Sequence, residues 1–158
     1  MLGLLVTGIK QQLGPAINGY ISNEFYIPAP SLQFEGTKRM LEEYQKRAAG
    51  LGTDPLGYTY PPYAYAAGQI LAEAVTQTKS LDDDKLADFL RKTTFKTVIG
   101  PIKFGDQGEW TTPRIICIQF QGVSGNDMGQ FTDWKRQVVV YPKEFTSGKL
   151  VYPFANAQ

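Results

Sequence analysis

The sequence predicts a mixed α/β fold, because short apolar runs typical of buried strands come first, amphipathic helices follow, and the chain ends in β-rich segments. The chain has 158 residues, of which 42% are hydrophobic and 13% aromatic. This composition suits a chain that folds around a core and does not suit a solvated coil. We find no internal repeat and no low-complexity segment, so one compact arrangement is expected.

The first third predicts two strands, a helix and a linker. Leu2–Val6 is continuously apolar, as expected of a buried strand, and Gly19–Ser22 predicts a second short strand. The apolar residues of Thr37–Ala49 share one helical face, and Thr37 is a suitable N-cap. Leu51–Gly57, with its glycines and a proline, is then expected to be a linker.

The middle third predicts two more helices. Pro62–Thr78 begins with proline and carries small residues that would allow close packing, namely Ala64, Ala67, Gly68 and Ala72. The acidic run Asp82–Asp84 would cap a helix that ends near Lys92, since carboxylates are favoured at a helix N-terminus. A metal site at these acids is the alternative, but consecutive side chains at a helix start splay apart, so capping is favoured.

The last third has β character. Two glycines in Gly105–Gly108 predict a hairpin that joins Ile102–Phe104 to Glu109–Thr111. Further strands are expected over Arg114–Phe120 and Gln137–Tyr141.

Composition removes several kinds of chemistry. The chain has no histidine, which excludes histidine-based catalytic triads and histidine metal sites. The net charge of +1 provides no field to recruit nucleic acid. The only cysteine, Cys117, lies in an apolar run and is expected to be buried and inert. Glycine-rich phosphate loops and a serine–lysine motif are missing too, so we expect a non-enzymatic protein without cofactor or metal.

Tyrosines cluster at the start of the second helix, at Tyr58, Tyr60, Tyr63 and Tyr65. Tyr65 lies on the apolar helix face and is expected in the core. Tyr60 and Tyr63 lie at the corner between linker and helix, where a ring can face a cleft while its hydroxyl stays hydrated. Packing against the core or over the linker is the alternative for both.

Two segments carry a resemblance to a known family. The run Asp54–Leu71, and Lys96–Phe104 followed by Gly108–Trp110, resemble the C-terminal part of periplasmic solute-binding proteins of the leucine/isoleucine/valine-binding family. These are the type I receptors of ABC importers. The resemblance covers roughly residues 14 to 145 and includes a hairpin of the form TVxGPIxF with a following G(D/E).

The resemblance implies a periplasmic-binding-protein type I fold, of which this chain would hold the C-terminal portion and parts of both three-layer α/β/α lobes. Residues 1–55 and 111–158 would belong to the C-terminal lobe, and 56–110 to the N-terminal lobe. The crossovers Leu51–Gly57 and Trp110–Pro113 would act as hinges. A small organic solute, either an amino acid or an aromatic or carboxylated compound, would bind between the lobes. A transporter permease would be the partner, and the location would be periplasmic, although no signal peptide is recognisable.

The candidate ligand contacts are Tyr60, Tyr63, Thr7 and Lys10. By the resemblance, Tyr60 matches an aromatic ligand contact of the family, and Thr7 and Lys10 lie in the turn after the strand that matches Leu2–Val6. Tyr63 is a candidate because it lies at the same corner as Tyr60. Amino-acid-binding members carry an acid just past the strand that matches Leu2–Val6, whereas this chain has a lysine there. An α-amino group would then lack its charged partner, which favours a neutral or carboxylated solute, an aromatic one among them.

Two alternatives stay open. Family members are more than twice as long as this chain, so it would be a truncated fragment that self-associates or serves as an interaction module without binding a solute. The same fold also serves ligand sensors that regulate a cytoplasmic partner.

Overall fold

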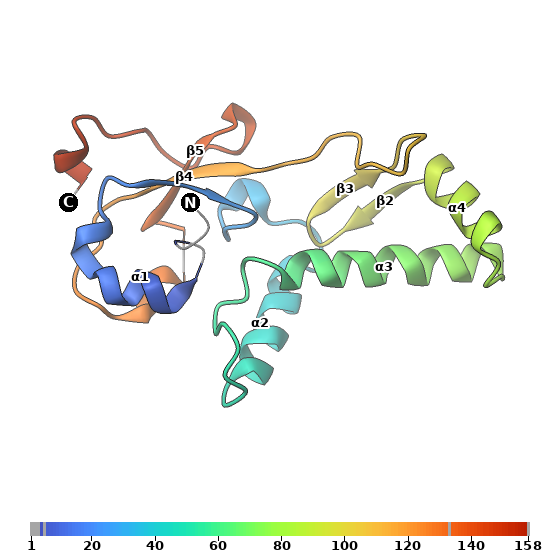
Figure 1. The fold of residues 1–158 in the computed structure, drawn as a ribbon, viewed down its shortest axis with the longest axis horizontal. Coiled ribbons are helices and arrows are strands. Elements are labelled where there is room, and N and C mark those ends of the chain that lie inside the picture. Colours follow the sequence, from blue (N-terminus) through green and yellow to red (C-terminus); the bar gives the residue numbers. More distant parts are fainter. Residues whose placement is uncertain (1–3, 5, 133, 158) are drawn as a thin grey trace.

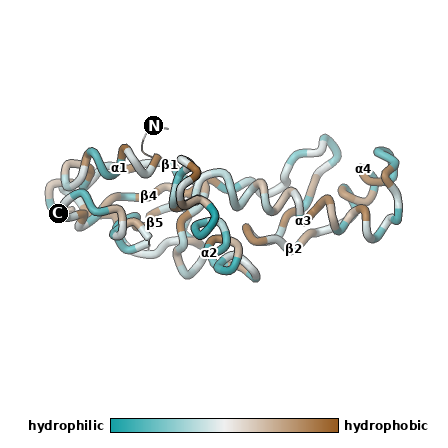
Figure 2. The backbone as a smooth tube through the Cα atoms, turned by 90° about the horizontal axis from the view of Figure 1, so that it is seen from below, coloured by the Kyte–Doolittle hydropathy of each residue, from teal (hydrophilic) through white to brown (hydrophobic). Residues whose placement is uncertain are grey.

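The computed structural model describes residues 4, 6–132 and 134–157. These residues form an elongated molecule with two bodies, one toward each end (Figures 1 and 2). The first body holds a helix and a three-stranded sheet: α1 (Thr7–Leu13), β1 (Ile21–Glu24), β4 (Ile116–Phe120) and β5 (Gln137–Tyr141). The second holds two helices and a two-stranded sheet: α3 (Pro61–Thr78), α4 (Asp83–Lys92), β2 (Thr94–Thr97) and β3 (Gly100–Lys103). Between them, α2 (Thr37–Ala48) projects from the junction (Figure 1).

Both described sheets are antiparallel, and the larger one has the order β1-β4-β5. Ile118 pairs with Ser22 on one side and Val139 on the other, and it is fully buried with Phe120 and Phe131. This sheet therefore provides the core of the first body. None of the helices in the described part of the chain is long and apolar enough to cross a membrane.

The three predicted helices are confirmed to within a residue or two. In α4 the Asp82 carboxylate accepts a hydrogen bond from the Lys85 backbone N–H at 3.0 Å, which is the predicted N-cap. In α2, however, the N-cap is Gly36, and Thr37 is the first helical residue. The prediction of Thr37 as N-cap was wrong, because its hydroxyl accepts from the Phe34 N–H at 3.0 Å, before the helix, and donates to Val98 O at 2.6 Å.

The buried face of α3 differs from the prediction. Its buried residues recur every fourth position, at Pro62, Ala66, Ile70 and Ala74. The small residues Ala64, Ala67, Gly68 and Ala72 are exposed, as is Tyr65, with 52% of its surface accessible. The expectation that Tyr65 is in the core was therefore wrong. A helix of this composition has several weakly apolar faces, and the hairpin decides which one is covered.

The strands follow the sequence less closely. Residues 1–3 and 5 lie outside the described residues, and so does most of the strand expected at 2–6; Val6 is exposed and precedes α1. The expected hairpin around residues 105–108 is confirmed as a short one, with a bridge between Phe104 and Trp110 and a hydrogen bond from the Thr111 N–H to Lys103 O at 2.9 Å. Strand β3 also pairs with β2, which the sequence did not indicate. Cys117 is only half-buried, and its thiol donates to Asn23 Oδ1 at 3.3 Å.

Candidate functional site: a cavity between α2 and α3

A cavity of about 880 Å³ opens between α2 and α3, at the junction of the two bodies. Its volume falls in the range of small-molecule sites. Residues from both helices line it, among them Arg39, Glu43, Tyr44, Tyr60, Tyr65 and Gln69. Of the four residues that the sequence proposed as ligand contacts, only Tyr60 lines this cavity.

Three tyrosine rings line the cavity. The Tyr44 hydroxyl donates to Asp54 O at 2.9 Å, which fixes the position of its ring. The Tyr60 ring packs against Phe25 with a centroid distance of 5.9 Å, yet 68% of the Tyr60 surface is accessible. Tyr65 lies more than one turn of helix further along α3 and is half exposed. The cavity therefore offers aromatic surface that the described chain leaves uncovered.

The charged groups of the cavity come from one face of α2, where Arg39, Glu43 and Arg47 recur every four residues. Arg47 lies 3.7 Å from the Glu43 carboxylate, and Lys46 lies 3.8 Å from its other oxygen. Arg39 forms no ion pair with any residue that the structure describes. The cavity wall thus carries a net positive charge.

Gln69 joins the cavity to the β2–β3 turn. Its side-chain oxygen accepts a hydrogen bond from the Val98 backbone N–H at 3.0 Å. The carbonyl of Val98 in turn accepts the hydroxyl of Thr37, the first residue of α2. The turn therefore bridges α2 and α3, and this bridge sets the spacing of the two cavity walls.

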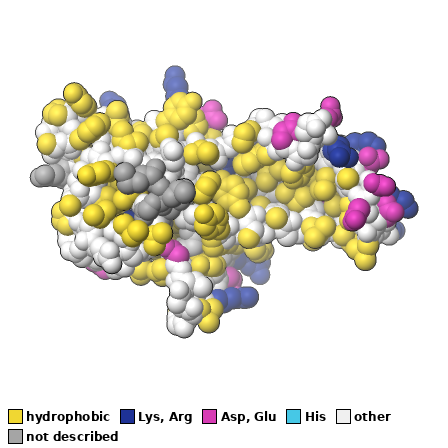
Figure 3. Space-filling view, viewed as in Figure 1, with side chains coloured by type: hydrophobic (Ala, Val, Ile, Leu, Met, Phe, Trp, Pro, Cys, Tyr) yellow, Lys and Arg dark blue, Asp and Glu magenta, His cyan; other side chains and the backbone are white. Residues whose placement is uncertain are grey.

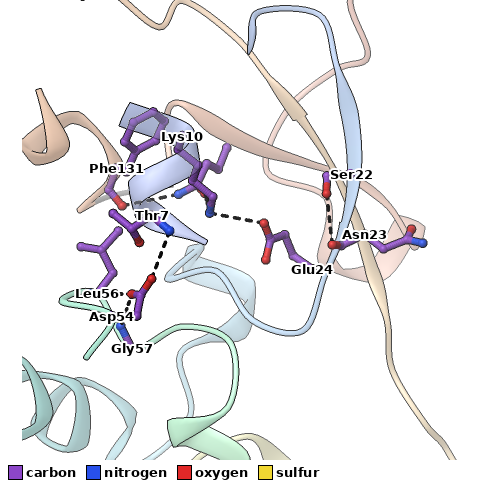
Figure 4. Close-up of polar contacts among 10 residues, drawn as sticks. Thr7, Lys10, Ser22, Asn23, Glu24, Asp54, Leu56, Gly57 and Phe131 are labelled. Carbon is purple, nitrogen blue, oxygen red and sulfur yellow. Dashed lines mark hydrogen bonds and ion pairs between the residues drawn. The ribbon is translucent and has the colours of Figure 1, made fainter. Parts of the chain in front are cut away.

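The connector between α2 and α3 is held to the first body by Asp54. Its carboxylate accepts hydrogen bonds from the backbone N–H groups of Thr7, Leu56 and Gly57 (Figure 4). Partial burial alone would raise the pKa of Asp54, but these hydrogen bonds outweigh it and hold the pKa below its usual value. Gly57 has φ +68°, and a Cβ there would collide with the Tyr44 ring, so this position requires glycine.

Lys10 and Thr7 lie away from the cavity, in the first body. Lys10 is 2% exposed, its ammonium lies 3.3 Å from Glu24 Oε1, and it donates to Gln137 Oε1 at 2.6 Å (Figure 4). Burial raises the pKa of Glu24 to about 7, although Lys10 opposes this. Thr7 is also buried, and its backbone N–H is bound by Asp54. The structure gives neither residue access to a solute.

Tyr63 faces the opposite side of α3. Its hydroxyl donates to Phe25 O at 3.0 Å, and its ring lines an apolar groove of about 310 Å³ between α3 and the β2–β3 hairpin. Leu71, Ile102, Phe104 and Trp110 line the same groove, and no charged side chain of the described chain does. Figure 3 shows hydrophobic side chains gathered over this half of the molecule.

Sequence reasoning missed the cavity residues Arg39 and Gln69, and it did not predict that Glu24 is buried against Lys10. The four-residue spacing of Arg39, Glu43 and Arg47 was a usable signal, because such residues share one face of a helix. Glu24 and Gln69 gave no local signal, since their partners are distant in sequence.

The described residues thus form two groups of helices and strands that share one hydrophobic core, with a cavity where they meet. The chain belongs to the periplasmic binding protein family, whose model matches residues 1–121. Curated relatives are the Leu/Ile/Val-binding protein homolog 1 of Brucella suis biovar 1 and that of Brucella melitensis biotype 1. Each is 27% identical over 120 residues, which cover 75% of this chain and 30% of the relative.

A solved structure shows the same fold. The leucine-binding protein LivK of Thermotoga maritima superposes with a TM-score of 0.57 at 19% identity, covering 77% of this chain and 33% of that one. The chain thus spans about a third of the length of these relatives. They are described as binding proteins, which agrees with the non-enzymatic function expected from the sequence.

Proposed function

We propose that this chain binds a small organic solute and belongs to the extracytoplasmic receptor of an ABC importer of the branched-chain-amino-acid type. Membership of the periplasmic binding protein family supports the receptor role. The main support for a binding site is that Tyr60 is largely exposed in a cavity of suitable volume at the junction of the two bodies.

Binding would work through differential affinity. Residues 1–55 and 111–158 would form one lobe segment and residues 56–110 the other, with hinges at Leu51–Gly57 and Trp110–Pro113. A solute that contacts both α2 and α3 binds more tightly to the closed arrangement, in which both helices reach it. Its binding therefore shifts the population toward the closed arrangement. A permease in the membrane would recognise this arrangement, and the location would be periplasmic.

The ligand contact that we retain is Tyr60. Tyr63 would position it, because both rings pack against Phe25, each with a centroid distance of 5.9 Å. Thr7 and Lys10 would support the first body instead of touching the solute, because both are buried and already bonded.

Calorimetric titration of the full chain tests this proposal. The panel comprises leucine, isoleucine, valine, phenylalanine and benzoate. At least one should bind, and Tyr60→Ala should weaken that binding about tenfold or more. Tyr20→Ala is the matched control, since Tyr20 is similarly exposed but does not line the cavity. Absence of binding by every probe, or equal weakening in both variants, would contradict the proposal.

A second candidate function is self-association through the apolar groove, without solute binding. The observation that favours it is the groove itself, because contiguous apolar surface on a soluble protein marks interaction sites. A homo-oligomer should then appear in sedimentation velocity and dissociate in Leu71→Glu. Leu81→Glu is the control, since Leu81 is more exposed yet lies outside the groove. A monomer across the accessible concentration range would exclude this function.

A further inference from the structure

We propose that the α2–α3 cavity selects an aromatic carboxylate that carries no ammonium group. This inference rests on the proposed solute-binding function and specifies the chemical class of the solute. Three features of the cavity support it: the tyrosine rings, an arginine without an acidic partner in the described chain, and the oriented amide of Gln69.

The tyrosine rings favour a flat aromatic body. Tyr44 is anchored by its hydroxyl, and Tyr60, with 68% of its surface accessible, contacts Phe25, so both helices present tyrosine surface to the cavity. Tyr65 adds a third ring on α3. Aromatic pairs gain from offset-stacked and edge-to-face contacts beyond the apolar area that they bury. An aliphatic side chain of the same volume gains only the burial.

The charge of the cavity favours an anion. Glu43 is the only acidic residue of the described lining, and Lys46 and Arg47 both lie within 4 Å of it. The guanidinium of Arg39 is left without a carboxylate partner in the described chain. A guanidinium matches a carboxylate with two parallel hydrogen bonds, which is the strongest pairing available to such a ligand.

Gln69 supplies a second donor. Because its side-chain oxygen is occupied by the Val98 N–H, its NH₂ group is the end that remains for a ligand. A carboxylate accepts from both Arg39 and Gln69. The only acidic residue of the described lining is Glu43, and its charge is already balanced by Lys46 and Arg47. The ammonium group of a zwitterionic amino acid would therefore be buried without a charged partner.

Calorimetric titration of the full chain with benzoate tests this class. Cyclohexanecarboxylate keeps the charge without the ring, benzyl alcohol keeps the ring without the charge, and phenylalanine adds the ammonium. Benzoate should bind about tenfold or more tightly than each of these, because each competitor either lacks one of the two favourable interactions or brings a charge that the cavity leaves unpaired.

Arg39→Gln should weaken benzoate binding about tenfold or more and leave benzyl alcohol unchanged. Lys38→Gln is the matched control, because it removes the same charge from the neighbouring residue of α2 without touching the cavity lining. Benzoate affinity should not change in that variant.

The outcomes separate this inference from the function on which it rests. If leucine or phenylalanine binds more tightly than benzoate, or if both variants weaken benzoate equally, the inference is overturned and solute binding stands. If no probe binds, both are overturned. If benzoate binds selectively, and this selectivity is lost in Arg39→Gln and kept in Lys38→Gln, the result supports both the inference and solute binding.

Discussion

At the scale of single residues, the buried pair of Lys10 and Glu24 shows what local sequence cannot reveal. Lys10 follows an apolar run and resembles an exposed ligand contact, but its ammonium is enclosed by Glu24, Gln137 and the ring of Phe120, whose centroid lies 5.8 Å away. All three partners are at least fourteen positions away in the sequence. Such a pair specifies how α1 sits on the sheet, because either charge left alone would be costly to bury.

Glu24 makes the stability of the protein dependent on pH. Its pKa is about 7 in the folded chain and 4.5 in an unfolded one, so the folded state binds the proton more tightly between these values. The free energy of unfolding should therefore fall as pH rises from about 4.5 to about 7, by at most about 1.4 kcal/mol per pH unit, and level off above. Denaturant titrations across this range measure the slope.

Glu24→Gln should remove that slope. Glu35→Gln is the control, because Glu35 is at the surface and outside the buried pair. Asp54, the other acid that influences Glu24, has a lowered pKa, so its contribution is lost only in more acidic solution, outside this window. An unchanged slope in Glu24→Gln would show that another group titrates.

At the scale of elements, the sequence predicted helices better than strand pairing. Helix α4 has a local N-cap, Asp82, and an apolar face of its own, so its start and end can be predicted from its own residues. The β2–β3 hairpin turns at Val98 and Ile99, which are apolar and buried. Turn-forming residues are usually polar or glycine, so the glycines at 105–108 correctly predicted their own turn, whereas this apolar turn gave no such signal.

The N-cap of α4 is a direct test of this local control. Asp82→Ala removes the acceptor for the Lys85 N–H and should lower the free energy of unfolding by about 1 kcal/mol. Asp83→Ala is the control: the residue is in the first turn but is not the cap, so only about 0.3 kcal/mol is expected from the helix dipole. Chemical denaturation followed by circular dichroism measures both. Equal destabilisation would mean that charge, and not capping, stabilises this end.

At the scale of the whole molecule, Arg114 fastens the two bodies together. Its guanidinium donates to Ile99 O, in the β2–β3 turn, at 2.6 Å. It also packs against Phe34, Phe145 and Trp110, whose ring centroids lie 5.3, 4.9 and 5.8 Å away. Burial lowers the pKa of Arg114, although Tyr63 and Glu144 oppose this. A single cation thus holds aromatic side chains from both bodies, and no short stretch of sequence contains this arrangement.

Arg114→Ala should therefore loosen the junction more than it damages either body. Without the charge-assisted hydrogen bond and the ring contacts, the free energy of unfolding should fall by about 2 kcal/mol. Hydrogen exchange should accelerate first in the β2–β3 turn, where the carbonyl of Ile99 loses its donor. Arg114→Lys keeps the charge but not the planar group that stacks on rings, so an intermediate effect is expected.

Arg91→Ala provides the comparison for that measurement, because Arg91 is an exposed arginine of the second body whose side chain pairs only with Asp88 in the described chain. Its removal should change stability by less than about 0.5 kcal/mol. If exchange in Arg114→Ala accelerates uniformly across β1, β4 and β5 as well, the residue stabilises the whole fold and does not act at the junction. Acceleration limited to the turn would instead show that Arg114 restrains the movement of the two bodies relative to each other. Such movement would also change the distance between α2 and α3, the two walls of the cavity.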